Sequence, residues 1–124
     1  MSAELSQKSI LFVLQHAPYG SSATQETLDA ALAAAAFEQK VQLFFTGDGV
    51  WSLIKNQHSD CIQRKNIEKI LQALQYYDIE TVYVDACSLQ NRELTTDRFA
   101  IPTTPLNANE QAALFQRVDC VIAL

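Results

Sequence analysis

The residue of this sequence with the clearest potential for chemistry is Cys87, because a cysteine thiolate is a strong nucleophile. Cys87 follows an apolar segment and is expected to open a short helix, Cys87–Arg92, whose N-terminus would favour a thiolate. Asp85 stands two residues earlier, however, and a nearby negative charge disfavours a thiolate. Two interpretations therefore stay open: Cys87 is either a reactive thiol or a small apolar residue packed under its loop.

The other two cysteines show less potential for catalysis. Cys61 lies in a polar segment without a visible activating group. Cys120 begins the apolar run Cys120–Leu124, where we expect it to be part of the core. The three cysteines match neither a disulfide framework nor a Cys-x-x-Cys pair, so we expect free thiols in a reducing compartment, the cytoplasm.

A possible anion site precedes the first predicted helix. The segment Pro18–Ser22 leads from an apolar strand to a helix N-terminus, where free N–H groups favour an anion. Neither the Walker spacing nor G-x-G-x-x-G is present. Gly20–Ser22 is therefore either a phosphate-binding turn of a small-ligand protein or simply a capped turn.

Metal and hydrolase sites have little support in the sequence. His58 and Cys61 offer two ligands where a structural zinc ion takes four, and His16 stands alone. No G-x-S-x-G motif occurs that would place a serine nucleophile. We therefore expect no metal and no bound cofactor.

The elements that position these residues form a strand–helix–strand pattern. The predicted strands are Ser9–Leu14, Val41–Thr46, Thr81–Val84 and Cys120–Leu124, with Phe99–Ile101 as a strand or an extended loop. Nearly continuous apolar runs suit parallel strands covered on both faces. We therefore predict one α/β domain over residues 1–124, a three-layer α/β/α sandwich with a mainly parallel four- to five-stranded sheet of flavodoxin-like type. Sites in such folds lie at the carboxyl ends of the strands, here in the loops Gln15–Ser22, Gly47–Val50 and Asp85–Leu89.

Two helix starts have recognisable caps. Ser22 followed by Gln25 matches a capping box, and Asn107 followed by Glu110 is predicted to cap the last helix. In the first helix, Ala33–Ala36 permits close approach to the sheet or to a second subunit.

Charge and hydropathy exclude several classes of protein. The 124 residues include 9 Lys and Arg against 14 Asp and Glu, a net charge of −5, without a basic run. A nucleic-acid-binding protein needs a basic footprint, so we expect no direct contact with nucleic acid. No segment approaches the roughly 20 apolar residues of a membrane helix. Because the stretch Met1–Lys8 is polar, we expect that it is not a signal peptide.

Several short motifs together resemble the DsrE/DsrF-like family. In order along the chain they are Ala17–Gly20, Leu28–Ala30, Gly47–Val50, Tyr77–Ile79, Val82–Val84 and Ser88–Leu89. The last three resemble its TusC/DsrF branch specifically, and the resemblance runs from about Ser9 to Leu124.

The resemblance implies a DsrEFH-like fold and a role in sulfur relay. Members of this branch assemble with TusB-like and TusD-like subunits, typically as a dimer of heterotrimers. Such a complex passes persulfide sulfur from a TusA-like donor to a TusE-like acceptor, and the sulfur becomes the 2-thio group of a wobble uridine in tRNA. The similar DsrF works with DsrE and DsrH in sulfur oxidation, which is the alternative destination.

The resemblance also implies that this chain has no catalytic residue. In the DsrE/TusD branch a persulfide-carrying cysteine ends the third strand, and that position falls near Val84 here. Cys87 lies about three residues later, so the role does not transfer to it. We expect no activity of the isolated chain, with Cys87 as a persulfide carrier kept as the alternative.

Aromatic residues bear on whether the chain works alone. Trp51, Tyr76 and Tyr77 either add an apolar interface or belong to the core. Since aromatic side chains favour interfaces, we expect that the isolated chain is not a well-behaved monomer.

Overall fold

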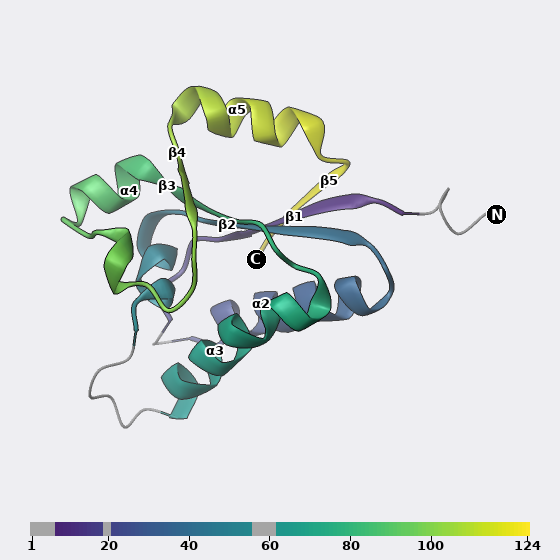
Figure 1. Cartoon of the computed structure of the whole chain (residues 1–124), viewed down its shortest axis with the longest axis horizontal. Coiled ribbons are helices and arrows are strands. Elements are labelled where there is room, and N and C mark those ends of the chain that lie inside the picture. The colour runs from purple at the N-terminus through teal and green to yellow at the C-terminus, as the bar shows by residue number, and fades with distance from the viewer. Residues whose placement is uncertain (1–6, 19–20, 56–61) are drawn as a thin grey trace.

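The computed structural model describes residues 7–18, 21–55 and 62–124 (Figure 1). The helices and strands within these ranges are β1 (Ser9–Leu14), α2 (Ala23–Ala36), β2 (Lys40–Phe45), the 3-10 helix η1 (Gly47–Leu53), α3 (Ile62–Ala73), the 3-10 helix η2 (Leu74–Tyr77), β3 (Val82–Asp85), α4 (Ala86–Asn91), the 3-10 helix η3 (Thr96–Arg98), β4 (Thr104–Leu106), α5 (Ala108–Arg117) and β5 (Cys120–Ala123).

The five strands form one parallel sheet in the order β4-β3-β2-β1-β5. All four strands expected from apolar runs are present, so the predicted α/β fold with a parallel sheet is confirmed. The register pairs Ser9 with Lys40 on one side of β1 and Ile10 with Cys120 on the other. The fifth strand is β4, and the candidate segment Phe99–Ile101 is not a strand of the sheet. Phe99 forms only an isolated antiparallel bridge with Ile54, so this segment is the extended loop of the two alternatives.

Helices cover both faces of this sheet, as Figure 1 shows with α5 above it and α2 and α3 below. Alternating side chains of β1 divide the core: Phe12 and Leu14 belong to the large cluster under α2 and α3. Leu11 and Val13 belong to a smaller cluster with Leu114 of α5. The α5 side is therefore the thinner of the two apolar layers.

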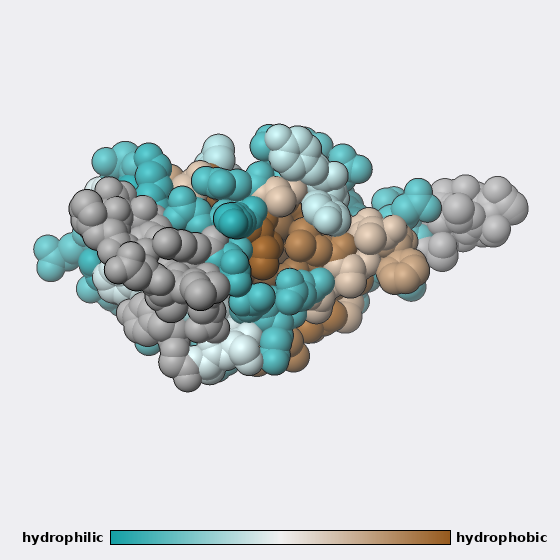
Figure 2. Space-filling model, turned by 90° about the horizontal axis from the view of Figure 1, so that it is seen from below, coloured by the Kyte–Doolittle hydropathy of each residue, from teal (hydrophilic) through white to brown (hydrophobic). Residues whose placement is uncertain are grey.

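The Ala-rich helix α2 packs on the sheet through its apolar face. Leu28 and Ala31 are fully buried in the large cluster, and Ala34 and Ala35 pack against its border. Figure 2 views the molecule from below in Figure 1, the side of α2 and α3, and shows apolar surface that runs from the middle of that face toward its right side. Ala34 and Ala35 of the alanine run therefore pack toward the sheet, and contact of this run with a second subunit stays a prediction.

The two predicted capping boxes have different outcomes. Asn107 is extended (φ −82°, ψ 177°), its Oδ1 accepts from Glu110 N at 2.9 Å, and Glu110 Oε1 accepts from Asn107 N at 2.8 Å, which confirms that box. Ser22 is the N-cap residue of α2 as predicted, but the predicted capping box is wrong, since Ser22 makes no side-chain cap and its Oγ donates to Glu26 Oε2 at 3.0 Å. With φ −95° and ψ 6°, Ser22 is not in the extended conformation that aims a cap side chain at the first turn.

The expectation that Cys120 belongs to the core is also wrong. Cys120 is exposed, because β5 is an edge strand and only Ile122 packs against the core cluster. Aromatic exposure is mixed: Trp51 packs against the core, whereas Tyr76 and Tyr77 are 80% and 41% exposed. Within the described ranges, no helix has the length and apolar character needed to cross a membrane.

Candidate functional site

The main polar cluster lies where β2 and β3 end, and Asp85 is its centre. This last residue of β3 accepts hydrogen bonds from Thr46 Oγ1 at 3.0 Å, Cys87 N at 3.1 Å, Ser88 Oγ at 2.7 Å and Gln111 Nε2 at 2.8 Å. One carboxylate therefore joins three segments: the end of β2, the start of α4 and the side of α5.

Local chemistry explains the two bonds closest to Asp85 in the sequence. Asp85 is the N-cap of α4 with an extended backbone, so its carboxylate reaches the free N–H of Cys87 in the first turn. The cap places the start of α4 one residue earlier than the sequence pattern predicts. Ser88 extends the cluster, since its Oγ also accepts from Gly47 N at 2.9 Å. Gln111 extends it on the other side by donating to Leu106 O at 2.9 Å.

These contacts change the acidity of the carboxyl group. Partial burial raises the pKa of Asp85, but hydrogen bonds from Ser88, Gln111, Thr46 and the Cys87 N–H outweigh it and hold the pKa below its ordinary value. Asp85 is therefore a fixed negative charge at neutral pH. Its four donors leave it little capacity to act as a base, so its contacts are those of a structural link.

Cys87 lies beside this carboxylate and is exposed. Its Sγ accepts from Asn91 Nδ2 at 3.7 Å, and within the described ranges no base or cation contacts the thiol. The nearby Arg92 instead forms an ion pair with Asp48 at 2.9 Å. The exposure rules out the packed interpretation, and the reactive interpretation finds no activating group in the described contacts. Val84, the position that the family resemblance assigns to the sulfur carrier, is fully buried.

The remaining sequence candidates are not brought together. Gly20, His58 and Cys61 lie outside the described residues, and Ser22 makes only the contact with Glu26 described above. The His16 ring contacts Leu124 O, with Nε2 at 2.7 Å. In the part of the chain that the structure describes, no group of three or more His, Cys, Asp or Glu residues could hold a metal ion.

Sequence reasoning missed the partners of Asp85. Thr46 and Asp85 each stand at the carboxyl end of a parallel strand, and that shared position was a usable signal for their contact. Gln111 gave no such signal, because it reaches Asp85 only through the crossover from β4 into α5.

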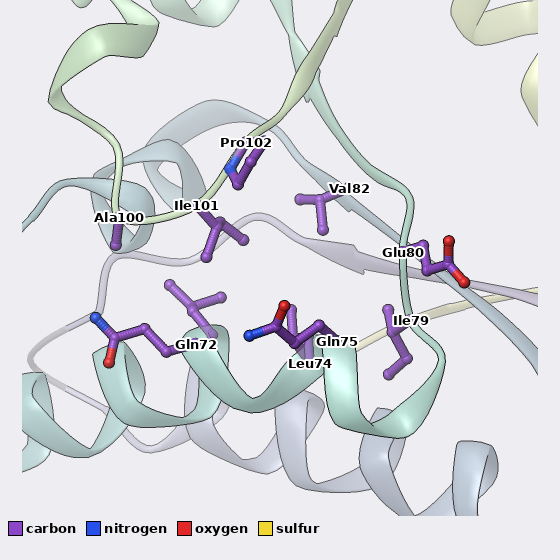
Figure 3. Close-up of a pocket in the computed structure, with 10 residues that line it drawn as sticks. Gln72, Leu74, Gln75, Ile79, Glu80, Val82, Ala100, Ile101 and Pro102 are labelled. Carbon is purple, nitrogen blue, oxygen red and sulfur yellow. The ribbon is translucent and has the colours of Figure 1, made fainter.

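A separate groove lies at the opposite end of β3. It has a volume of about 530 Å³ and is lined mainly by apolar side chains of α3, β3 and the segment before β4, among them Leu71, Ile79, Val82 and Ile101. Figure 3 shows Glu80 turned away from this groove, with Gln72 and Gln75 along its helical wall. The groove is therefore distinct from the Asp85 cluster.

The fold and the cluster define a class: a small α/β protein with one parallel sheet and a linked set of loops at its carboxyl edge. The chain belongs to the DsrE/DsrF-like family, whose model matches residues 8–124.

Relatives in two bacterial groups cover nearly the whole chain. A protein from Pseudomonas aeruginosa named "Protein TusC homolog" is 35% identical over 117 residues, which are 94% of this chain and 98% of that protein. "Protein TusC" from Shigella flexneri is 38% identical over 116 residues, which are 93% and 98%. The crystal structure of the ychN protein from E. coli has a TM-score of 0.82 over 95% of this chain and all of that one. At 22% identity it supports the fold alone.

Proposed function

We propose that this chain is the TusC-like, non-catalytic subunit of a sulfur-relay complex that passes persulfide sulfur toward 2-thiolation of the tRNA wobble uridine. The observation that carries the proposal is identity of 35–38% to proteins named TusC over 93–94% of the chain. The partners are TusB-like and TusD-like subunits, with a TusA-like donor and a TusE-like acceptor. The complex acts in the cytoplasm, where Cys87 and Cys120 would stay reduced.

The chemistry of this relay needs no oxidant at any step. An acceptor thiolate attacks the outer sulfur of a donor persulfide, the S–S bond breaks, and the donor leaves as a thiolate. In the proposal these thiols belong to the partners. This chain supplies a rigid loop surface, which Asp85 holds by joining β2, α4 and α5.

Assembly is the first prediction from this proposal. When the chain is co-expressed with the TusB-like and TusD-like subunits of its own genome, we expect all three to elute together through affinity and size-exclusion steps. The matched control is an unrelated α/β protein of similar size carrying the same affinity tag. Elution of this chain alone, with the other two subunits folded and present, would contradict the proposal.

A second prediction concerns Cys87 and the alternative that it carries persulfide. We expect Cys87→Ser to leave the 2-thiouridine content of bulk tRNA nearly unchanged, because the described contacts of the thiol include no base or cation. Since Cys87 is exposed, the substitution should change stability by no more than about 0.5 kcal/mol.

Two control variants frame this result. Cys120→Ser in this chain is the matched substitution of an exposed cysteine, whereas a Ser variant of the carrier cysteine in the TusD-like partner should abolish the modification. Loss of 2-thiouridine in the Cys87 variant, with folding and assembly intact, would make this chain the carrier. A normal 2-thiouridine content in a strain lacking this chain would instead favour the DsrF-like role in sulfur oxidation.

A further inference from the structure

The pairing between β3 and β4 stops at a proline. Its first pair is Tyr83 with Thr104, and the same register places Thr81 opposite Pro102. In a parallel ladder, the residue opposite Thr81 donates its N–H to the residue before Thr81 and accepts the N–H of the residue after it. Proline has no N–H to donate. The chain therefore leaves β3 at Pro102, and the groove described above opens where β4 would otherwise continue.

The backbone beside this groove has two unpaired groups. On the side of β2, Leu43 N donates to Thr81 O at 3.5 Å, and alternate residues of a parallel strand bond to the same neighbour. Glu80 C=O and Val82 N–H therefore point away from β2, toward the groove. Within residues 7–18, 21–55 and 62–124, neither group has a hydrogen-bond partner. Val82 is only 5% exposed, and a buried N–H is rarely left unpaired in a native structure.

The walls of the groove limit what can enter it. Its volume of about 530 Å³ is in the range of small-ligand pockets, so it can hold a short segment of chain but not a folded subunit. Figure 3 shows Ile79 and Ile101 on opposite sides of the groove, with Leu74 below. Of the described lining residues only Glu80 is ionisable, and its side chain turns away (Figure 3). The groove therefore offers no counter-ion to a charged ligand.

We propose that this groove binds a short extended peptide segment that is uncharged and apolar. One residue of the segment takes the place opposite Thr81, so that its N–H donates to Glu80 O and its C=O accepts from Val82 N. An extended backbone offers both groups, whereas a helix does not, because its N–H and C=O groups bond to one another. The side chain before that residue points toward α3, as Val82 does, and meets apolar surface there. This binding does not depend on the proposed sulfur-relay role.

Two blocked tripeptides test the backbone pairing. The probe is acetyl-Ala-Leu-Ala-amide, whose leucine meets the apolar surface and whose last residue pairs with Glu80 and Val82. By NMR titration of the full chain, we expect a dissociation constant below about 1 mM and slower hydrogen exchange at Val82 N–H. The matched peptide has N-methylalanine as its last residue and lacks only the paired N–H. It should bind at least about fivefold more weakly, the factor expected for one hydrogen bond.

Two proline variants of the chain give an independent readout. Pro102→Ala restores an N–H opposite Thr81, so the chain's own backbone should pair with Glu80 O, close the groove and weaken probe binding at least about fivefold. Pro105→Ala is the matched control and should leave probe binding unchanged. Position 105 lies an odd number of residues from position 102, so its N–H would point away from β3. Both prolines are exposed, so both variants should fold.

No binding of the probe at about 5 mM, with rapid exchange at Val82 N–H, would show that the groove holds water alone and would overturn this inference. Equal binding of the two peptides would overturn it as well, and so would a folded Pro102→Ala variant that binds the probe as the wild type does. If Pro102→Ala failed to fold by circular dichroism, the comparison of the two peptides would still decide.

Discussion

Gly49→Ala should destabilise this protein more than Asp85→Ala or any substitution of its cysteines. A Cβ at Gly49 would overlap the carbonyl oxygen of Leu14 and lie 2.6 Å from its carbonyl carbon. That oxygen also accepts from Thr46 N at 3.0 Å, so it is held in the sheet and cannot move aside. We expect a loss of more than about 3 kcal/mol in the free energy of unfolding, measured by urea denaturation, or no folded protein at all.

Gly47→Ala is the matched control, two residues away in the same 3-10 helix. A Cβ at Gly47 would meet Gln15 O at 3.8 Å, an ordinary contact, but the residue has φ +55°. Alanine in that left-handed conformation costs about 1–2 kcal/mol. Equal losses for the two variants would show that close approach to β1 is not what requires glycine at position 49. The consequence of that approach is that η1, and with it the Gly47–Val50 loop, is held against the end of β1.

Asp85→Ala is expected to have the next largest effect. It removes the acceptor of four hydrogen bonds and leaves Thr46, Ser88 and Gln111 without their shared partner. Hydrogen bonds to a charged group contribute about 1.5–3 kcal/mol each when buried, and partial exposure of Asp85 reduces this. We expect a loss of about 2–4 kcal/mol in the free energy of unfolding. The exposed ion pair gives the control, since Asp48→Asn should cost no more than about 1 kcal/mol.

The same carboxylate gives a pH dependence with a defined sign. Because the pKa of Asp85 in the folded chain is below its ordinary value of 3.8, the folded state binds this proton less readily than the unfolded state. Its contribution to stability is complete above the ordinary pKa and is lost as the pH falls through the lower, folded value. The stability difference between wild type and Asp85→Asn should therefore be constant near neutral pH and shrink below about pH 4. A difference that grows on acidification would contradict this assignment.

Features that depend on neighbouring residues were predictable from the amino-acid sequence. Continuous apolar runs separated by helical segments specify parallel strands with helices between them, and this pattern predicted four of the five strands. The capping box at Asn107 was predictable because it joins residues three apart in the chain. The family motifs are likewise short segments whose order along the chain is itself sequence information.

Features that join distant segments depend on how the whole chain packs. Which strand takes the edge is set by strand order, so the exposure of Cys120 and of β5 could not be read from an apolar run that looks the same inside a sheet. Ser22 occupies the N-cap position of α2 but makes no capping bond, because its backbone has φ −95° and ψ 6°, a conformation that its residue type does not determine. Asp85 collects donors from positions 46 and 111, which lie 39 and 26 residues away along the chain. Such contacts arise because parallel strands end together at one edge and the crossover helix packs over it, and no local run of residues encodes that placement.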